Sequence, residues 1–248
     1  MRILSLNIEG PKHLDRVVPF LNSQCPDIAC LQELSDSDIP TILSQTNLKK
    51  CHFVAMARHP ALQPDQRGGV GIFSRYPFIA TNHLTYAGQG KGDRVVDLAN
   101  EETRFRTCRY VVALVKLDIN GIIFRIGTTH FPWTSNGQPT SFQWQAAHNL
   151  ISLLNDQPIV LTGDFNAPRG GPIFELLAEK WTDWIPPYIT TSLDPELHYA
   201  APLELMVDGL FTSPHYQANS VAFHDGLSDH QAIIAELATT ASNALRNN

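Results

Sequence analysis

Residues 159–166 read Ile-Val-Leu-Thr-Gly-Asp-Phe-Asn, an apolar run that closes on Gly163, Asp164 and Asn166. Short apolar runs bounded by turn-forming residues are typical of buried strands. Because Gly, Asp and Asn all favour turns, this segment alone predicts only a strand that ends in a turn. It becomes informative because other strands along the chain end in a similar way.

Polar side chains stand at the ends of five further predicted strands. They are Asn7 and Glu9 at the end of residues 3–8, Gln32 and Glu33 after 28–31, His130 after 122–128, Asp208 before 210–211, and Asp229 with His230 before 231–237. A strand end presents a side chain with little freedom, so several ends can converge on one site. Each also has an ordinary interpretation: Asp229-His230 as a cap or ion pair, Glu33 as a surface residue, and Asn7 as a turn former.

The residue types in this set favour a hard cation. Carboxylate and amide oxygens without zinc-type Cys and His spacing are the ligands that Mg²⁺, Mn²⁺ or Ca²⁺ prefer. Two histidines beside acids, His130 and His230, supply groups that can polarise a phosphoryl oxygen or move protons near neutral pH.

The rest of the chain predicts packed sheets with helices outside. Helices are expected over 13–23, 36–48, 142–154 and 172–180, and further strands over 70–73, 110–117 and 221–223. Asn120-Gly121 is a strong hairpin signal between two of the strands. Residues 82–108 are expected to form a functional loop, and residues 181–204 to be irregular.

Length and composition fit one soluble globular domain. The chain has 248 residues, of which 43% are hydrophobic and 17% charged, and no linker or repeat divides it. We expect a catalytic domain over 1–238 and a small polar tail over 239–248, with fraying from Ala238. No apolar run approaches the roughly 18 to 20 residues of a membrane helix. No secretory leader is visible, and the four cysteines predict reduced thiols in the cytoplasm, although signal-less export would leave the same composition.

The charge is uneven along the sequence. The formal net charge is −6, which disfavours tight non-specific binding to duplex DNA. Residues 49–109 nevertheless hold ten of the 18 Lys and Arg residues against five acids. Either these bases are solvated loop residues, or they form a basic wall that receives an anionic substrate.

Seven segments, in this order, resemble the endonuclease/exonuclease/phosphatase superfamily. They are Leu6–Gly10, Leu31–Glu33, Arg67–Arg75, Thr129–Phe131, Leu161–Asn166, Val207–Gly209 and Leu227–His230. The superfamily includes DNase I-like nucleases, abasic-site endonucleases, neutral sphingomyelinases, inositol polyphosphate 5-phosphatases and deadenylases. The resemblance implies an α/β (α+β) fold of the DNase I-like type, a four-layer sandwich of two packed mixed β-sheets flanked by helices.

The resemblance also implies roles for individual residues. Glu33 would be the principal ligand of Mg²⁺ or Mn²⁺, with Ca²⁺ as a further candidate, and Asn7, Glu9 and Asp229 would complete or support the metal site.

Five residues would carry the chemistry of the phosphate. Asp164 would orient or deprotonate the attacking water, and Asn166 would hold the phosphate or that water. His230 would contact the phosphate, with Asp208 fixing its tautomer and favouring its charged form. His130 would be a second phosphate contact, or an acid near the leaving group.

The chain departs from the family pattern near His130. The abasic-site endonuclease branch tends to use a tyrosine at this position, which favours the other branches. DNase I-like nucleases pair the histidine with a glutamate in the segment that here reads Asp65-Gln66-Arg67. Either His130 has another partner, or Arg67 has taken a role in binding the phosphate. Trp133 is a candidate to stack on a base or aromatic leaving group, although the aromatic residues at 131–144 are more often packing residues.

We therefore expect a divalent-metal-dependent phosphoester hydrolase that acts as a monomer without an obligate protein partner. Its substrate would be a nucleic acid end, a nucleotide or a phosphorylated small molecule. The alternatives are a lipid-directed, sphingomyelinase-like hydrolase, an inositol phosphate hydrolase, and a non-catalytic binding scaffold. The scaffold is disfavoured because Glu33, Asp164 and His230 are all present.

Overall fold

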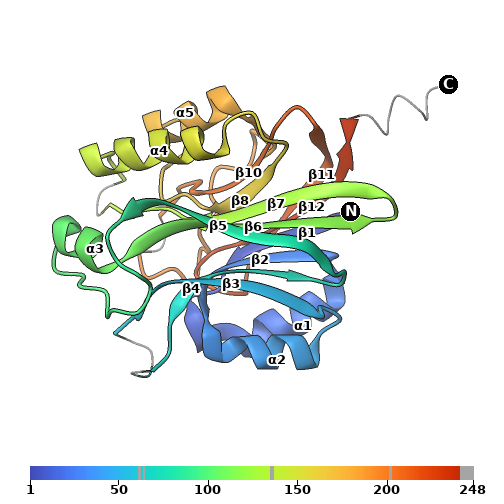
Figure 1. Cartoon of the computed structure of the whole chain (residues 1–248), viewed down its shortest axis with the longest axis horizontal. Coiled ribbons are helices and arrows are strands. Elements are labelled where there is room, and N and C mark those ends of the chain that lie inside the picture. The colour runs from blue at the N-terminus through green and yellow to red at the C-terminus, as the bar shows by residue number, and fades with distance from the viewer. Residues whose placement is uncertain (61–62, 64, 135–136, 201–202, 241–248) are drawn as a thin grey trace.

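Two six-stranded sheets lie face to face in the computed structural model of the chain, which describes residues 1–60, 63, 65–134, 137–200 and 203–240 (Figure 1). The first sheet has the order β11-β12-β1-β2-β4-β3. Its strands are β1 (Arg2–Asn7), β2 (Ile28–Ser35), β3 (Lys50–Ala57), β4 (Gly68–Ser74), β11 (Tyr216–His224) and β12 (Ala232–Thr239). It is a mixed sheet, because β1 runs parallel to β2 and antiparallel to β12.

The second sheet is also mixed, with the order β5-β6-β7-β8-β10-β9. Its strands are β5 (Phe78–Gly88), β6 (Arg109–Ile119), β7 (Ile122–His130), β8 (Val160–Asp164), β9 (Thr182–Asp183) and β10 (Asp208–Thr212). The predicted Asn120-Gly121 hairpin joins β6 to β7, where Ile119 pairs with Ile122. β7 and β8 are parallel, and the crossover between them contains a helix, as is usual for parallel strands.

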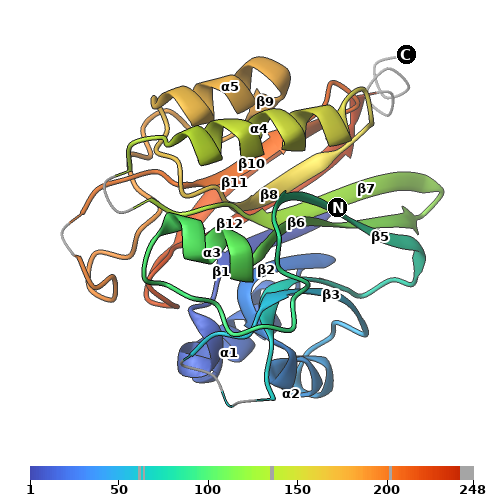
Figure 2. The same cartoon turned by 60° about the vertical axis from the view of Figure 1, so that its left-hand side comes forward.

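Helices cover the outer faces of both sheets. α1 (Leu14–Gln24) and α2 (Ile39–Gln45) lie against the first sheet, and α4 (Ser141–Leu154) and α5 (Pro172–Lys180) lie against the second (Figure 1). Single turns, η1 (Gly10–His13) and η2 (Asp36–Asp38), precede α1 and α2. α3 (Glu101–Thr107) lies outside these layers, beside β5 (Figure 2). The predicted four-layer sandwich is confirmed.

The alternation of side chains along each strand decides which residues can meet between the sheets. In β1, Leu4 and Leu6 pack toward α1 and α2, whereas Ile3 packs in the core between the sheets. Successive side chains in a strand point to opposite faces, so Ser5 and Asn7 share the inner face with Ile3. The inner face therefore changes from apolar to polar toward the end of β1.

Three strands and one α-helix were missing from the sequence prediction: β3, β5, β9 and α3. The last seven residues of β5 together with α3 occupy much of the stretch expected to be a loop over 82–108, and β9 lies in the stretch expected to be irregular. β5 is an edge strand with mostly exposed side chains, so it lacks the alternation that marks a half-buried strand. The predicted helix over 36–48 ends earlier, at Gln45.

The end of the described chain is more ordered than predicted. Ala238 and Thr239, which were expected to fray, remain paired in the sheet with Gln217 and Tyr216. The last eight residues, 241–248, lie outside the described residues. The longest described helix, α4, has 14 residues. No described helix combines the length and apolar character that crossing a bilayer requires.

The four cysteines are free thiols with very different accessibility. Burial raises the pKa of Cys30, Cys51 and Cys108 to about 12 in each case, whereas Cys25 is exposed at the end of α1. Since the thiolate is the reactive species, we expect only Cys25 to react rapidly with Ellman's reagent at about pH 8. All four should react after unfolding in guanidinium, and Cys25→Ser should remove the rapid phase. A second rapid thiol in the folded protein would contradict the packing of these strands.

Candidate active site

Three of the predicted site residues lie side by side across the second sheet. Asp164 at the end of β8 pairs with His130 of β7 on one side and with Asp208 of β10 on the other. All three face the first sheet, because Thr128, two residues before His130 in β7, accepts a hydrogen bond from Gln32 of the first sheet (Nε2–Oγ1 2.8 Å). The turn signal Gly-Asp-Phe-Asn therefore places Asp164 at the centre of a polar row.

Gly163 is required for this strand end. Its φ of +150° lies in a region that side-chain-bearing residues rarely adopt, and a Cβ there would lie 2.0 Å from the carbonyl oxygen of Thr129. A backbone carbonyl cannot move aside without breaking the parallel pairing of β7 and β8. Only glycine therefore lets the two strands approach closely enough to bring His130 beside Asp164.

Asn7 extends from the first sheet to the same point. Its Nδ2 donates to Asp164 Oδ2 and to Glu33 Oε1, both at 3.1 Å, and its Oδ1 accepts the backbone N–H of Glu9 at 3.1 Å. The hydroxyl of Ser228, in the Ser-Asp-His segment, donates to the backbone oxygen of Asn7 at 2.5 Å. Asn7 thus joins the two sheets and connects a predicted metal ligand to the predicted water-handling carboxylate.

Glu33 reaches the site through an irregularity in β2 that the sequence did not predict. The pairing of β2 with β4 shifts register between Leu31 and Leu34, which indicates a β-bulge, and Glu33 has a left-handed φ of 53°. Leu31 and Leu34 both pack toward the helices, so the bulge inserts an extra residue and redirects its side chain. Glu33 is consequently the one exposed residue of an otherwise buried strand. Strain of this kind tends to occur at functional sites.

Asp164 contacts both predicted histidines. It is 1% exposed, and its Oδ2 lies 3.4 Å from His130 Nε2 and 3.9 Å from His230 Nε2. Its Oδ1 accepts the backbone N–H of Asn166 at 2.8 Å. Asn166, which has a left-handed φ of 48°, uses its side-chain nitrogen to bond Phe131 O at 3.0 Å.

His230 is held by Asp208 as the resemblance implied. The distance from His230 Nδ1 to Asp208 Oδ2 is 2.7 Å, and both side chains are buried. Burial alone would lower the pKa of His230, but the carboxylates of Asp208 and Asp164 raise it well above the usual histidine value. Ser192, which the sequence did not indicate, accepts the backbone N–H of Asp208 at 3.1 Å.

Among the described residues, one group of side chains has its ligand atoms close enough together to hold a cation, and a second group was predicted from the sequence. The ligand atoms of Asp164, Asp208 and His230 lie within 4.8 Å of one another. In that group, however, Nδ1 of His230 is already engaged in a hydrogen bond with Asp208. The second group is the predicted metal set around Glu33 and Asp229.

Asp229 shows that negative charge accumulates in this second group. Burial raises the pKa of Asp229 to about 7; His230 opposes that rise, whereas Glu33, Glu9 and Asp164 add to it. In the described part of the chain, the buried Oδ1 of Asp229 has no hydrogen-bond partner. A buried carboxylate oxygen without a donor among other carboxylates is a position that a cation would stabilise.

Glu9 is already engaged by two basic residues that the sequence did not indicate as part of the site. Its carboxylate bonds Lys12 Nζ and lies 3.0 Å from His13 Nε2. The hydrogen bond with Glu9 raises the pKa of Lys12, and the charges of Asp229 and Glu33 raise it further. The ammonium group of Lys12 therefore lies in the field of the three acids predicted to bind the metal.

Two acids lie near the ring of His130. Its Nε2 lies 3.4 Å from Asp164 Oδ2 and 4.0 Å from Glu33 Oε1. His130 therefore has acidic neighbours without a residue from the segment 65–67.

Arg67 and Trp133 are both partly exposed and contact residues outside the polar row around Asp164. The guanidinium of Arg67 is half-exposed and pairs with Asp36, with Nε 2.9 Å from Oδ2. Trp133 is 44% exposed, and the guanidinium of Arg104 lies 5.0 Å from its ring centre.

The basic stretch 49–109 does not form a single wall. Lys50 pairs with Ser74 in the sheet, and the backbone N–H of Lys49 donates to Ser74 O. Ser74 lies opposite Ile28, at the start of β2, so these lysines lie at the end of the sheet away from Glu33. The stretch therefore places bases at both ends of the first sheet.

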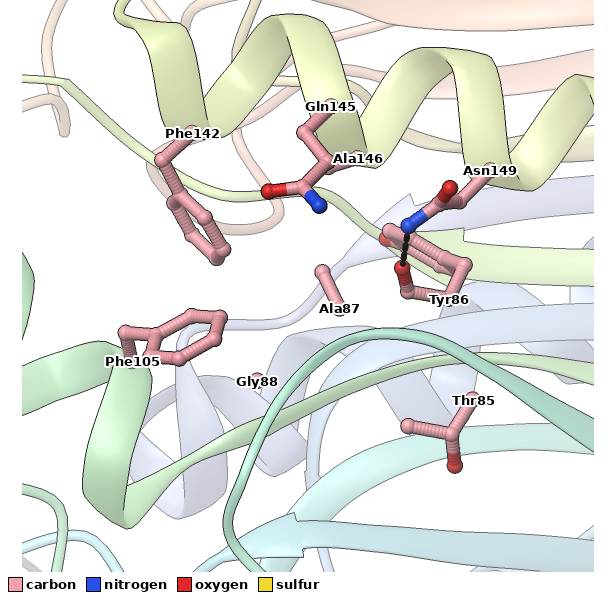
Figure 3. Close-up of a pocket in the computed structure, with 9 residues that line it drawn as sticks. All are labelled: Thr85, Tyr86, Ala87, Gly88, Phe105, Phe142, Gln145, Ala146 and Asn149. Carbon is pink, nitrogen blue, oxygen red and sulfur yellow. Dashed lines mark hydrogen bonds between the residues drawn. The ribbon is translucent and has the colours of Figure 1, made fainter.

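A cavity of about 230 Å³ lies beside the edge strand β5, between α3 and α4 (Figure 3). Phe105 and Phe142 face each other at one end of it, with their rings 4.9 Å apart, and Asn149 bonds the backbone oxygen of Tyr86 at the other (Figure 3). None of its lining residues belongs to the predicted site.

Many solved structures share this fold. A functionally unknown conserved protein from Enterococcus faecalis superposes with a TM-score of 0.72 at 17% identity, covering 96% of this chain and 100% of that one. The human Nocturnin catalytic domain, with a bound sulfate anion, gives 0.68 at 17% identity, covering 97% and 93%. A mannosyl-6-phosphatase from Bacteroides thetaiotaomicron gives 0.66 at 12% identity, covering 96% and 99%. The fold is therefore the DNase I-like two-sheet sandwich.

The sequence itself matches the Endonuclease/Exonuclease/phosphatase family over residues 4–230. The chain belongs to this family, which confirms the resemblance carried by the seven ordered segments. A search of the curated proteins found no match. Members of the family are generally phosphoester hydrolases.

Proposed function

We propose that the protein is a divalent-metal-dependent hydrolase of phosphoesters. The observation that carries the proposal is the environment of Asp164. This buried carboxylate lies among Asn7, His130 and His230, and the carboxylates of the predicted metal set are adjacent to it. Such a site combines a group that can accept a proton with groups that can neutralise a phosphate.

The residues of the metal set suit a hard divalent cation. The unpartnered Oδ1 of Asp229, the raised pKa of that carboxyl and the ammonium of Lys12 among the acids all indicate a position that favours positive charge. We propose Glu33 and Asp229 as ligands of Mg²⁺ or Mn²⁺, supported by Asn7 and Glu9, with Lys12 withdrawing when the cation binds. The bound cation would act as a Lewis acid that polarises a phosphoryl oxygen.

The chain's own residues would then perform the displacement. Asp164 orients a water molecule and accepts its proton as the water oxygen attacks phosphorus and the bond to the leaving oxygen breaks. His230, protonated because Asp208 and Asp164 hold its pKa high, donates to a phosphoryl oxygen and offsets its charge. His130, beside Asp164 and Glu33, makes a second phosphate contact or acts as the acid that protonates the leaving oxygen, and Asn166 holds the phosphate or the water.

We propose a substrate that presents a phosphate on a small or terminal group: a nucleic acid end, a nucleotide or a phosphorylated small molecule. The mannosyl-6-phosphatase and the sulfate-bound Nocturnin domain are consistent with compact anionic substrates on this fold. Trp133 and Arg67 are proposed to contact the substrate outside the phosphate. We further propose that the protein acts in the cytoplasm as a monomer.

The first experiment is hydrolysis of bis-p-nitrophenyl phosphate with Mg²⁺ or Mn²⁺. Turnover that a chelator abolishes and added metal restores would support the proposal, and no turnover with either metal would contradict it. A panel of plasmid, single-stranded DNA, RNA, mononucleotides, sugar phosphates, inositol phosphates and sphingomyelin then identifies the substrate. Preference for sphingomyelin in vesicles would favour the lipid-directed alternative.

Metal binding should also be visible without catalysis. We expect Mn²⁺ or Mg²⁺ to raise the melting temperature of the wild-type protein, because a ligand that binds only the folded state stabilises it. Glu33→Gln should raise the metal concentration at half-effect by at least about 10-fold, since even residues that only support metal ligands contribute that much. Glu179→Gln, at an exposed position on α5, is the matched control. Equal metal response in the wild type and Glu33→Gln would exclude Glu33 as a ligand.

A further inference from the structure

Residues 192–198, in the segment before β10, include backbone that pairs directly with the stretch containing Asp229 and His230. Leu193 forms an isolated antiparallel bridge with His230. On either side of it, the N–H of Asp194 donates to Asp229 O at 2.9 Å, and the N–H of Gln231 donates to Ser192 O at 2.7 Å. The position of this segment is therefore set by the site itself, even though the sequence predicted only an irregular region.

Asp194 fixes the turn that follows. Its side chain is 2% exposed, and its carboxylate accepts three backbone N–H groups, from Glu196 (2.9 Å), Leu197 (2.8 Å) and Gly226 (2.6 Å). The N–H of His198 then donates to the backbone oxygen of Asp194 at 3.3 Å. A buried carboxylate with three donors holds a loop in one conformation, so residues 194–198 form a preorganised turn.

This turn brings a third histidine to the site. The ring centre of His198 lies 6.4 Å from that of His230, with the rings at 74°. Nδ1 of His198 accepts the backbone N–H of Ala200 at 3.2 Å, so Nδ1 carries no proton and Nε2 does. In the described part of the chain, no hydrogen bond engages that Nε2–H.

The pKa of His198 reflects both burial and the charges of the site. Burial lowers the pKa of His198 and the positive charge of His230 lowers it further, whereas the charges of Glu9 and Asp164 act in the opposite direction. His198 is thus a neutral imidazole within range of the proposed phosphate contact, the water-handling carboxylate and an acid of the metal set. Its ring also lies against that of Tyr199, 4.7 Å away, whose side chain is 82% exposed.

We propose, on the basis of the proposed phosphoester hydrolysis, that His198 is a substrate-binding residue whose Nε2–H donates a hydrogen bond to a phosphate oxygen. The turn uses Nδ1 for its own backbone and leaves Nε2 for a ligand. A neutral donor suits this position, because a further imidazolium beside His230 would be repelled. His198 supplies this donor from a loop, whereas His130 and Asp164 come from strands.

Two substitutions separate this role from a structural one. His198→Asn retains an oxygen near the position of Nδ1 and can still accept the N–H of Ala200, but it lacks a donor at the position of Nε2. His198→Gln does the reverse, since its amide nitrogen reaches the position of Nε2. We expect His198→Asn to raise KM and the inhibition constant of inorganic phosphate by about 10- to 100-fold, the usual effect of losing a hydrogen bond to a charged group.

His198→Gln should stay within a few-fold of the wild type in both constants. Thermal unfolding should show the opposite ranking, with His198→Asn closer to the wild type, because only Asn preserves the loop contact. His148→Gln, at an exposed position on α4, is the control for replacing a histidine. If His198→Gln is as impaired as His198→Asn, or if His198→Asn binds phosphate normally, His198 does not donate to the phosphate.

The proposal can fail separately from the proposed function. Binding of inorganic phosphate in the presence of Mg²⁺, followed by calorimetry, uses no turnover. Absence of hydrolysis by the wild-type protein would overturn the proposed function, whereas equal phosphate affinity in the wild type and His198→Asn would overturn the role of His198.

Discussion

We expect Asp164→Asn to lower kcat by about 10²- to 10⁴-fold, the range attributed to a positioned general base. The substitution preserves the shape of the side chain and an oxygen that can accept the N–H of Asn166. It removes the negative charge that Asn7, His130 and His230 surround, and an amide cannot accept the proton of the attacking water. Substrate binding should change less than kcat, because the histidines and the metal set remain.

The measurement is steady-state hydrolysis of bis-p-nitrophenyl phosphate at saturating metal, with circular dichroism to verify the fold. Asp15→Asn, at an exposed position near the start of α1, is the matched control and should retain wild-type turnover. If Asp164→Asn keeps more than about one tenth of the wild-type kcat, Asp164 is not the general base.

Much of the site was predictable because its strand ends follow local rules. Asp164, His130 and Asp208 lie at strand boundaries, and the alternation of side chains then directs them to the inner face. The Asn120-Gly121 hairpin and the helix over Pro172–Lys180 also follow from local sequence, and both are confirmed. Features whose conformation is decided by neighbouring residues in the sequence could therefore be predicted from the sequence.

Two other features depended on contacts that local sequence does not contain. The bulge at Glu33 arises from the pairing of β2 with β4, and nothing in Leu31-Gln32-Glu33 predicts a left-handed glutamate. His198 reaches the site only because its loop bridges to His230, which is 32 positions later in the chain.

α3 was missed for a different reason. Its signals were present: Asn100 caps the helix and exchanges hydrogen bonds with Thr103, acids occupy the first turn, and bases occupy the last. The helix has only seven residues and none of them is buried, so no apolar stripe marked it. Capping chemistry would have identified it where hydrophobic periodicity could not.

We expect His230→Gln to lower kcat by about 10²- to 10³-fold, the usual effect of removing one preorganised donor that stabilises transition-state charge. Asp208→Asn should have a smaller effect of the same kind, because Asp208 acts through His230 by fixing the tautomer and the charge of the ring. If that is so, the two substitutions will not be additive: Asp208→Asn should change kcat little once His230 is Gln. Additive losses would mean that Asp208 contributes independently of His230.

Unfolding in the presence of chelator tests the charge of this pair directly. The folded-state pKa of His230 lies well above the ordinary value of 6.5. A group with a raised folded pKa contributes stability that is fully present below the unfolded pKa and is lost as the pH rises through the folded pKa. The free energy of unfolding lost in His230→Gln should therefore be largest below about pH 6.5 and should shrink in alkaline solution. A loss that is constant with pH would show that folding does not raise the pKa of His230, and a loss that grows as the pH rises through about 6.5 would show that His230 is neutral in the folded protein. Either result would contradict its proposed role as a charged phosphate contact.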